Sequence, residues 1–303
     1  MRGGADGESV RRGPDLGGDS ASPRHAGRRA HVALPGAAPR RDDQHVRSLD
    51  REAAGATWGD GPVVAGSVAI VTGASSGLGL ELALRMAERR AVVGVSRRAP
   101  TDARWRVLED AGSCRHVAGD VAETDTTTRA FAEADRLGRL DVVVNCAGVG
   151  RFAPAGGHAP GEVADVIRSN VVGLIAFSET AYGRFSSAAG TIVNVLSTAA
   201  FEARPGEAVY CASKWAARGY TLTLQAEAKG SPVRVIAVYP GGMATAFWDR
   251  ADRHPPELHS FLAPASVAER IVAAMDAAGG ALVDEIVIRR GPAPEPPHRA
   301  GAP

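Results

Sequence analysis

The sequence VAIVTGASSGLG at residues 68–79 joins a short Val- and Ile-rich run to a turn with three glycines, and the helical pattern LELALRMAERR follows at residues 80–90. A strand, a glycine turn and a helix in this order bring a pyrophosphate onto the helix N-terminus, where backbone N–H groups favour negative charge. Gly73 and Gly77 permit a tight turn and close approach of the backbone, and Gly79 permits close packing of helix on strand. The alternative is an ordinary glycine-rich turn. The cofactor-binding residues expected here are Gly73, Ser75, Ser76, Gly77, Leu78 and Gly79.

Apolar runs alternate with helical patterns from about residue 64 to residue 290. This alternation is typical of βαβ units, whose parallel sheet is buried on both faces. The sequence therefore predicts an α/β fold, one doubly wound Rossmann domain with a seven-stranded parallel sheet and helices on both faces. The expected strands are at residues 68–72, 91–96, 114–118, 140–145, 190–196, 233–239 and 283–288. The expected helices are at residues 78–89, 101–111, 124–137, 161–185, 207–229 and 265–278.

The two ends of the chain differ from this domain in composition. Residues 1–63 are rich in Gly, Ala, Pro, Arg and Asp without periodicity, and residues 291–303 are rich in Pro. Both segments are predicted to be disordered, as an N-terminal extension and a C-terminal tail. The N-terminal segment lacks the apolar run of a signal peptide and is more acidic than a typical transit peptide.

The net charge, the cysteines and the apolar runs limit the kinds of partner and cell compartment that we expect. The formal net charge of +1 over 303 residues gives no reason to expect a nucleic acid. Cys114, Cys146 and Cys211 are scattered without metal-ligand spacing, so we expect no metal site and a reducing compartment. Every apolar run is shorter than the ~18 residues needed to span a bilayer. These features predict a cytoplasmic protein that does not enter membranes.

The end of the second strand carries the residues Ser96-Arg97-Arg98. Dinucleotide-binding folds often have an acid here that binds the adenosine ribose hydroxyls. A guanidinium instead pairs with the extra phosphate of NADP, and Ser96 can donate a hydrogen bond to it. The sequence thus predicts NADP rather than NAD, with Arg97 as the main determinant. The alternative is that these arginines are solvated loop residues.

Two further strand ends belong to the same edge of the sheet. Gly119-Asp120-Val121 follows the third strand, and Asn145-Cys146-Ala147-Gly148 closes the fourth. Open α/β sheets bind ligands at these carboxyl ends. Asp120 either accepts a hydrogen bond from the adenine amino group or caps the next helix. Asn145 is expected to tie neighbouring strand ends together.

Tyr210 and Lys214 stand four residues apart in the sequence YCASK. On a helix this spacing places both side chains on one face, about one turn apart. A phenol titrates near ~10 in water, and a cation at roughly 4 Å would lower its pKa toward neutrality, where acid–base catalysis works best. Chance pairing is improbable because Lys214 and Lys229 are the only lysines of the chain.

Residues 64–290 resemble the short-chain dehydrogenase/reductase family. The resemblance is carried by several motifs in the family's order, and by the interval of 13 residues between Ser197 and Tyr210. Cys146 departs from the usual Asn-Asn-Ala-Gly, a change that should not affect the chemistry. The end of the domain, residues 283–290, is similar to the branch that acts on small hydroxy acids and serine. The motifs are TGASSGLG, GDV, NCAG, Asn170, Ser197, YCASK and Tyr239-Pro240-Gly241.

The resemblance implies roles for individual residues. Tyr210 would protonate the substrate carbonyl oxygen, and Lys214 would lower its pKa and bind the nicotinamide ribose. Ser197 would hold the substrate oxygen, and Asn170 would kink its helix and support a water that relays protons to Lys214. The cofactor-binding set implied is completed by Ser96, Arg97, Asp120, Val121, Asn145, Ala147, Gly148, Pro240, Gly241 and Thr245, with Tyr210 and Lys214.

The leading hypothesis is an NADP-dependent oxidoreductase that interconverts a secondary alcohol and a ketone or aldehyde. Loops at residues 149–152, 198–204 and 242–250 should form a pocket for a small substrate, and an arginine there could bind a carboxylate. The alternatives are a catalytically idle NADP-binding redox regulator and a reductase of 3-oxoacyl thioesters. A sugar epimerase or dehydratase is disfavoured by the glycine spacing. The family implies a homodimer or homotetramer.

Overall fold

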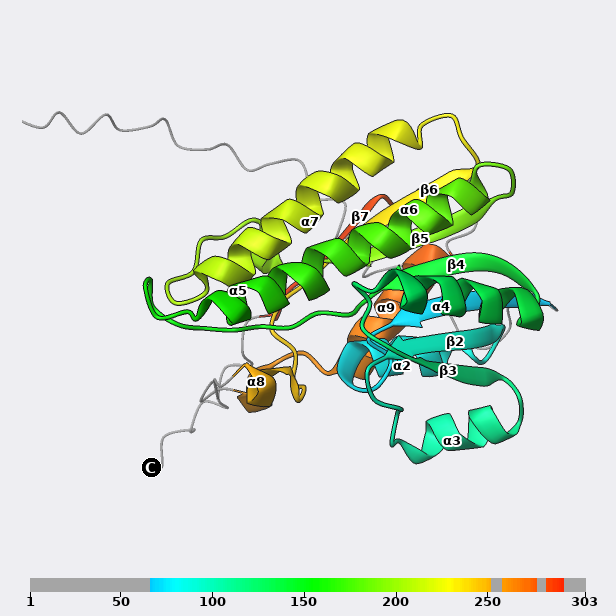
Figure 1. Ribbon diagram of the computed structural model, residues 1–303, viewed down its shortest axis with the longest axis horizontal. Coiled ribbons are helices and arrows are strands. Elements are labelled where there is room, and N and C mark those ends of the chain that lie inside the picture. Colours follow the sequence, from blue (N-terminus) through cyan, green and yellow to red (C-terminus); the bar gives the residue numbers. More distant parts are fainter. Residues whose placement is uncertain (1–65, 252–257, 277–281, 292–303) are drawn as a thin grey trace, which may run out of the picture. The chain divides into compact units, whose positions relative to one another are not determined.

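The computed structural model of the protein describes residues 66–251, 258–276 and 282–291 (Figure 1). The predicted N-terminal extension at residues 1–63 lies outside these described residues, and so does the predicted C-terminal tail apart from Gly291. The end of the helix predicted at residues 265–278 also lies outside them.

A single sheet of seven parallel strands forms the centre of the described structure. Its strands are β1 (Ser67–Thr72), β2 (Ala91–Ser96), β3 (Cys114–Ala118), β4 (Arg139–Asn145), β5 (Gly190–Val195), β6 (Val233–Pro240) and β7 (Glu285–Ile288). The strand order is β3-β2-β1-β4-β5-β6-β7, which confirms the predicted doubly wound fold. The chain runs outward from β1 to β3 and then returns to the other side of β1. Ligands of open α/β sheets bind at this reversal, beyond the carboxyl ends of the strands.

Helices cover both faces of the sheet (Figure 1). They are α2 (Gly77–Met86), α3 (Ala103–Asp110), α4 (Thr124–Leu137), α5 (Pro160–Ile167), α6 (Gly173–Phe185), α7 (Ala208–Glu227), α8 (Phe247–Arg250) and α9 (Pro264–Met275). Phe131, Phe177 and Leu224 bring α4, α6 and α7 into the apolar core of one face. Leu82 and Ile271 bring α2 and α9 into the core of the other face. Since both faces are covered, the strands β1 and β2 inside the sheet are mainly apolar and buried rather than alternating.

The helix predicted at residues 161–185 changes its winding in the middle. Between α5 and α6 lies a π-helical segment, Arg168–Val172, which contains the buried Asn170. The Oδ1 atom of Asn170 accepts a hydrogen bond from the Val149 N–H at 2.8 Å, and its Nδ2 atom donates to the Val149 carbonyl at 2.9 Å. The apolar periodicity predicted the helix but not this wider turn, because the turn depends on a loop distant in sequence. Such π-turns often occur at functional sites.

Three short elements were not predicted. The four-residue helix α8 and the two single turns Thr198–Ala200 and Leu258–Ser260 are too short for helical periodicity to appear in the sequence. Two of the three elements, Thr198–Ala200 and α8, lie in loops that follow strands on the ligand-binding edge of the sheet.

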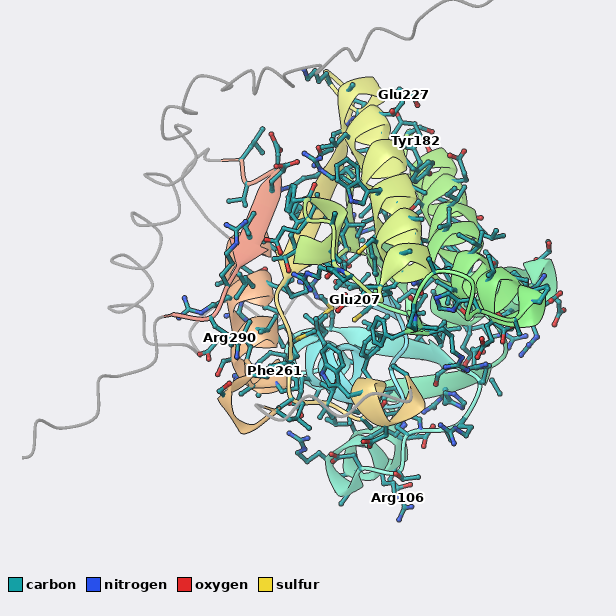
Figure 2. All side chains as sticks on the ribbon, turned by 90° about the vertical axis from the view of Figure 1, so that its left-hand side faces the viewer. Arg106, Tyr182, Glu207, Glu227, Phe261 and Arg290 are labelled. Atoms are coloured by element: carbon teal, nitrogen blue, oxygen red, sulfur yellow. The ribbon has the colours of Figure 1, made fainter. Side chains whose placement is uncertain are left out.

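The last described segment packs against the loop that follows β6 (Figure 2). The Arg290 guanidinium lies 4.8 Å from the centre of the Phe261 ring and donates to Ser260 Oγ at 2.7 Å. Phe261 in turn contacts Trp248 of α8, with ring centres 5.4 Å apart. These contacts hold in place the base of the loop that carries α8.

Among the described helices, none combines the length and apolar character required to cross a membrane.

Candidate active site

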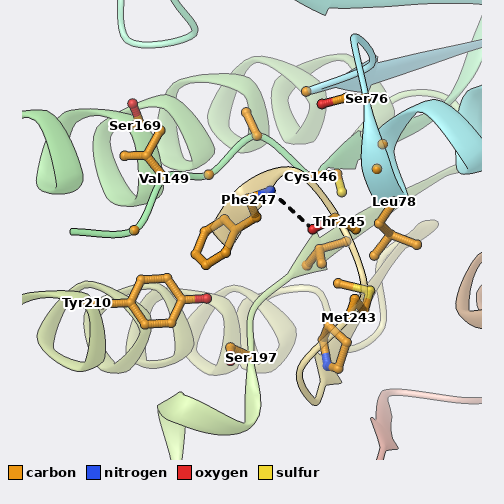
Figure 3. A pocket seen from close by; sticks show the side chains of 18 of the residues that line it. Ser76, Leu78, Cys146, Val149, Ser169, Ser197, Tyr210, Met243, Thr245 and Phe247 are labelled. Atoms are coloured by element: carbon orange, nitrogen blue, oxygen red, sulfur yellow. Dashed lines mark hydrogen bonds between the residues drawn. The ribbon is translucent and has the colours of Figure 1, made fainter. Parts of the chain in front are cut away.

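A cleft runs along the carboxyl ends of the strands, from the glycine turn to Tyr210 (Figure 3). Loops that follow β1, β2, β3, β4, β5 and β6 contribute to its walls. Of the predicted site residues, the cleft is lined by Gly73, Ser75, Ser76, Gly77, Leu78, Gly79, Ser96, Arg97, Asp120, Val121, Ala147, Gly148, Ser197, Tyr210, Lys214, Pro240, Gly241 and Thr245. Asn145 and Asn170 are not among the described lining residues.

The glycine turn has the geometry that a dinucleotide requires. Gly73 and Gly77 adopt φ angles of 74° and 59°, a region that side chains disfavour. A Cβ atom on Gly73 would lie 2.9 Å from the Ala147 backbone, and one on Gly79 would lie 2.7 Å from the Gly73 carbonyl carbon. The first turn of α2 carries no acid, so its N–H groups favour an anion there. The turn therefore fits the pyrophosphate of a dinucleotide.

The residues predicted to select NADP lie at and after the end of β2, which is hydrogen-bonded to the glycine turn. Arg97 is exposed and lines the cleft. The Ser96 hydroxyl donates to the Arg98 carbonyl at 2.8 Å and lies 3.1 Å from His116 Nε2, so it must turn to bind a phosphate. His116 was not singled out in the sequence because a histidine inside a strand has no distinguishing local pattern.

The N-cap alternative for Asp120 is wrong. The N-cap residue of α4 is Glu123, whereas Asp120 Oδ1 accepts a hydrogen bond from the Ala122 N–H at 3.0 Å. Asp120 lines the cleft beside the buried Val121. Its position is thus compatible with the predicted contact to an adenine amino group.

Asn145 does not line the cleft, and its side chain instead helps to position the neighbouring strands. Its Nδ2 atom donates to Asn194 Oδ1 at 2.8 Å, which joins β4 to β5, and to Ser178 Oγ at 2.9 Å. Asn194 Nδ2 donates in turn to Thr221 Oγ1 on α7 at 3.0 Å. All four side chains are buried. The prediction that Asn145 ties strand ends together is confirmed, while direct contact with a cofactor is not supported because the side chain faces this network.

Ser197, Tyr210 and Lys214 converge at one end of the cleft. Ser197 follows β5, and its Oγ atom accepts a hydrogen bond from the Ala199 N–H at 3.1 Å. Both Ser197 and Tyr210 line this end of the cleft, and the Ser197 side chain acts to lower the pKa of the phenol. The buried Lys214 Nζ atom donates to the Val195 carbonyl at 3.2 Å and lies 5.8 Å from the centre of the Tyr210 ring. The predicted juxtaposition of phenol and ammonium is therefore present.

Asn170 does not line this end of the cleft but forms hydrogen bonds to residues next to it. Besides its bonds to Val149, its Nδ2 atom donates to Ser213 Oγ at 2.9 Å, and Ser213 precedes Lys214 on α7. A Cβ atom on Gly148 would lie 3.2 Å from Asn170 Oδ1 and 3.7 Å from Lys214 Nζ. Asn170 thus joins the loop after β4 to the helix that carries Tyr210 and Lys214.

The predicted fall in the Tyr210 pKa is wrong for this structure. Burial raises the pKa of Tyr210 to about 12, and the Ser197 side chain opposes this only in part. Burial also lowers the pKa of the Lys214 ammonium to about 8. The amine is hydrogen-bonded to the Val195 carbonyl, and desolvation of the phenol outweighs any attraction of the ammonium for the phenolate.

These pKa values predict how stability changes with pH. The unfolded chain holds the Lys214 proton up to about 10.5, whereas the folded protein releases it near 8, so wild-type stability should rise with pH between these values. The free energy of unfolding of the wild type relative to Lys214→Met should increase by up to ~3 kcal/mol across this window. Tyr210 acts in the opposite direction above pH 10, but it is present in both proteins and cancels. Urea unfolding at several pH values measures the difference.

The control for this experiment is Lys229→Met, which removes the exposed lysine of the chain. Its stability difference from the wild type should not change with pH, because the side chain is solvated in both states. A Lys214→Met difference that is equally independent of pH would contradict the burial argument.

The substrate end of the cleft differs in part from expectation. Phe247 and Trp248 line it, but Phe201 packs against Tyr239 with ring centres 4.4 Å apart and is not among the described lining residues. Thr245 Oγ1 accepts a hydrogen bond from the Phe247 N–H at 3.3 Å (Figure 3). A Cβ atom on Gly77 would lie 3.2 Å from Thr245 Cγ2, so Thr245 stands directly over the glycine turn.

Glu207 and Cys146 are two of the lining residues that were not predicted as site residues. Glu207 is buried at the N-terminus of α7, one turn before Tyr210, and its charge raises the pKa of the phenol further. Cys146 also lines the cleft, and burial raises the pKa of its thiol to about 12, so the thiol remains neutral as expected for a conservative change. The sequence contains no signal for Glu207, since an acid before a helix is usually solvated.

Known proteins resemble this chain over the described sheet and cleft. A family model described as short chain dehydrogenase matches residues 67–255. D-threitol dehydrogenase from Mycolicibacterium smegmatis is 34% identical over 191 residues, which cover 61% of this chain and 74% of that protein. A short chain dehydrogenase from Burkholderia cenocepacia, solved in complex with NADP, is 30% identical with a TM-score of 0.62 and covers 74% of this chain and 88% of that one. The closed form of serine dehydrogenase complexed with NADP+ shares the fold, at 24% identity and a TM-score of 0.64 over 73% of this chain and 94% of that one.

Proposed function

The chain belongs to the short chain dehydrogenase family and is an oxidoreductase that acts on hydroxyl and carbonyl groups, and from this premise we propose that it is an NADPH-dependent carbonyl reductase. The observation that carries the proposal is the convergence of Ser197, Tyr210 and Lys214 at one end of a cleft whose other walls are the glycine turn and Arg97. A relative solved with NADP at 30% identity supports the choice of cofactor.

The residues divide the chemistry between them. NADPH, when bound, supplies a hydride to the carbonyl carbon. The Tyr210 hydroxyl would donate its proton to the carbonyl oxygen, and Ser197, which lines the same end of the cleft, would donate a second hydrogen bond to that oxygen as charge develops on it. Lys214, held by the Val195 carbonyl, offers its remaining N–H groups to the nicotinamide ribose and attracts the phenolate that forms.

The direction of the reaction follows from the state of the phenol. Because burial raises the pKa of Tyr210 to about 12, the group holds its proton at neutral pH and is an acid rather than a base. A protonated Tyr210 serves carbonyl reduction, whereas alcohol oxidation requires the phenolate. We therefore expect reduction to be the faster direction at neutral pH and oxidation to gain rate as the pH rises.

The proposal is tested by following NADPH absorbance with a panel of ketones and aldehydes, including 3-oxo acids and a 3-oxoacyl thioester. Consumption of NADPH that depends on a carbonyl compound supports the reductase. Binding of NADPH without turnover of any compound would instead favour the idle redox regulator. The homodimeric or homotetrameric state remains a prediction, and analytical ultracentrifugation tests it.

Cofactor selection gives a separate prediction. Arg97→Asp should raise the KM for NADPH by about 10- to 100-fold, because it removes a charged hydrogen bond to the ribose phosphate worth roughly 1.5–3 kcal/mol. The KM for NADH should change little. The matched control is Arg106→Asp, which makes the same charge change on the exposed face of α3. An unchanged preference for NADPH over NADH in Arg97→Asp would show that Arg97 does not select the cofactor.

A further inference from the structure

Four aromatic rings from three segments meet at the substrate end of the cleft. Phe152 follows β4, Phe247 and Trp248 belong to α8, and Tyr210 belongs to α7. The ring centres of Phe152, Phe247 and Tyr210 form a triangle with sides of 5.6, 5.7 and 6.0 Å. Trp248 lies 5.8 Å from Phe152 and 5.4 Å from Phe247. The catalytic phenol is therefore one member of an aromatic cluster, which we define as these four residues.

The members of the aromatic cluster differ in how strongly their contacts hold them in place. The buried Trp248 donates its indole N–H to the Met243 carbonyl at 2.9 Å and packs on Phe261. Phe247 is partly exposed, and its ring lies beside the Tyr210 hydroxyl, where a substrate carbonyl must come (Figure 3). A ring offers only apolar and aromatic contacts, so Phe247 can move away at lower cost than Trp248.

Gly150 allows the rings to close over the cleft. A Cβ atom there would lie 2.6 Å from the Phe247 Cζ atom and 2.9 Å from the Phe152 Cζ atom. The tips of both rings thus rest against bare backbone. The Phe247 ring therefore fills a flat, apolar slot between the loop after β4 and α8, of a shape that suits another planar ring.

The charges around this slot are already compensated. Arg204 lines the cleft, but its Nη2 atom lies 2.8 Å from Glu202 Oε2 and its Nη1 atom lies 3.8 Å from Glu207 Oε2. The same guanidinium donates to Thr198 Oγ1 at 2.7 Å. Arg151 lies 4.0 Å from Glu162. A substrate carboxylate would have to displace one of these acids and would be repelled by the buried Glu207.

We propose that the substrate is an uncharged carbonyl compound with an aromatic ring, which packs edge-to-face against Phe152 and Trp248 in the place that the Phe247 ring now occupies. The inference rests on the proposed reductase function and names its substrate class. The carbonyl carbon gains the hydride, the carbonyl oxygen gains the Tyr210 proton, and NADPH is oxidised to NADP+ while the ring stays unchanged. The compensated charges favour an uncharged carbonyl compound over one that carries a carboxylate.

Two matched pairs of substrates test the proposal in the wild-type protein. Acetophenone and cyclohexyl methyl ketone have the same carbon skeleton but a planar or a puckered ring, and kcat/KM should be about 3- to 10-fold higher for acetophenone. Methyl phenylglyoxylate and the phenylglyoxylate anion differ in charge beside the carbonyl, and the ester should be at least about tenfold better. Equal values within both pairs would overturn the substrate class but leave the reductase function standing. Failure of every carbonyl compound would overturn both.

Two variants test the role of the rings. Phe152→Leu should raise the KM for acetophenone by about 3- to 10-fold with little change in kcat, and should not raise it for cyclohexyl methyl ketone. Phe247→Ala should lower the KM for acetophenone, because no ring has to be displaced. The matched control Phe201→Leu alters a ring that packs on Tyr239 and Arg218 outside the cleft, and it should change neither constant.

Equal effects of Phe152→Leu on both ketones would show a general packing role and contradict an edge-to-face aromatic contact. A melting temperature is recorded for each variant. If Phe152→Leu does not fold, the Phe247→Ala result and the wild-type substrate pairs still decide between the outcomes.

Discussion

Tyr210→Phe should lower kcat for carbonyl reduction by about 10³-fold while leaving the dissociation constant for NADPH nearly unchanged. General acid catalysis by a positioned side chain contributes roughly 10²- to 10⁴-fold, and Phe keeps the ring but removes the proton that the carbonyl oxygen needs. The ring contacts with Phe152 and Phe247 are retained, so the cleft should keep its shape. Single-turnover rates and fluorescence titration with NADPH measure the two quantities separately.

Tyr220→Phe is the matched control, since Tyr220 lies on the same helix but donates its hydroxyl to Glu179 at 2.8 Å, outside the cleft. It should retain wild-type kcat and NADPH affinity. If Tyr210→Phe reduced carbonyl compounds at the wild-type rate, another group would have to supply the proton and the mechanism would be wrong.

Gly79→Ala should weaken NADPH binding by about 10- to 100-fold and destabilise the protein. The new methyl group would lie 2.7 Å from the Gly73 carbonyl carbon and 3.2 Å from the Thr72 oxygen, both backbone atoms that cannot rotate away. Relieving such an overlap costs roughly 1–3 kcal/mol and must open the glycine turn, which is the surface that faces the pyrophosphate. Isothermal titration with NADPH and urea unfolding measure the two effects.

Gly183→Ala provides the comparison, because a Cβ atom there meets nothing within 4 Å. Gly183 lies inside α6, where alanine is favoured over glycine by about 1 kcal/mol, so this variant should be slightly more stable with unchanged NADPH affinity. Wild-type affinity in Gly79→Ala would mean that the turn tolerates a side chain and does not approach the cofactor closely.

The sheet was predictable because its signals are local. The strands predicted at residues 91–96 and 114–118 agree with β2 and β3 at both ends, and the other five differ by at most two residues at either end. Runs of Val and Ile bounded by glycine, arginine or aspartate indicate buried parallel strands without further information. The glycine turn was equally predictable, since its function is indicated by the strand that precedes it and the helix that follows it.

The features that the sequence did not predict correctly depend on tertiary contacts rather than on local pattern. The phenol pKa and the substrate-loop position of Phe201 depend on contacts between segments distant in the chain, whereas the kink that the resemblance implied at Asn170 is present as a π-helical segment. Phe201 and Phe247 look alike in sequence, yet the first packs against Tyr239 and the second lines the cleft. Nothing in the neighbouring residues distinguishes them.

Local periodicity and spacing were therefore enough to predict the order of strands and helices along the chain, the glycine turn and the proposed acid–base pair, because these patterns act between near neighbours. Only the tertiary structure decided how deeply Tyr210 and Lys214 are buried, which rings surround the phenol and how the charges of Arg204 and Glu207 are compensated. Desolvation and pairwise electrostatics depend on which distant groups come together, and that information appears only when the chain is folded.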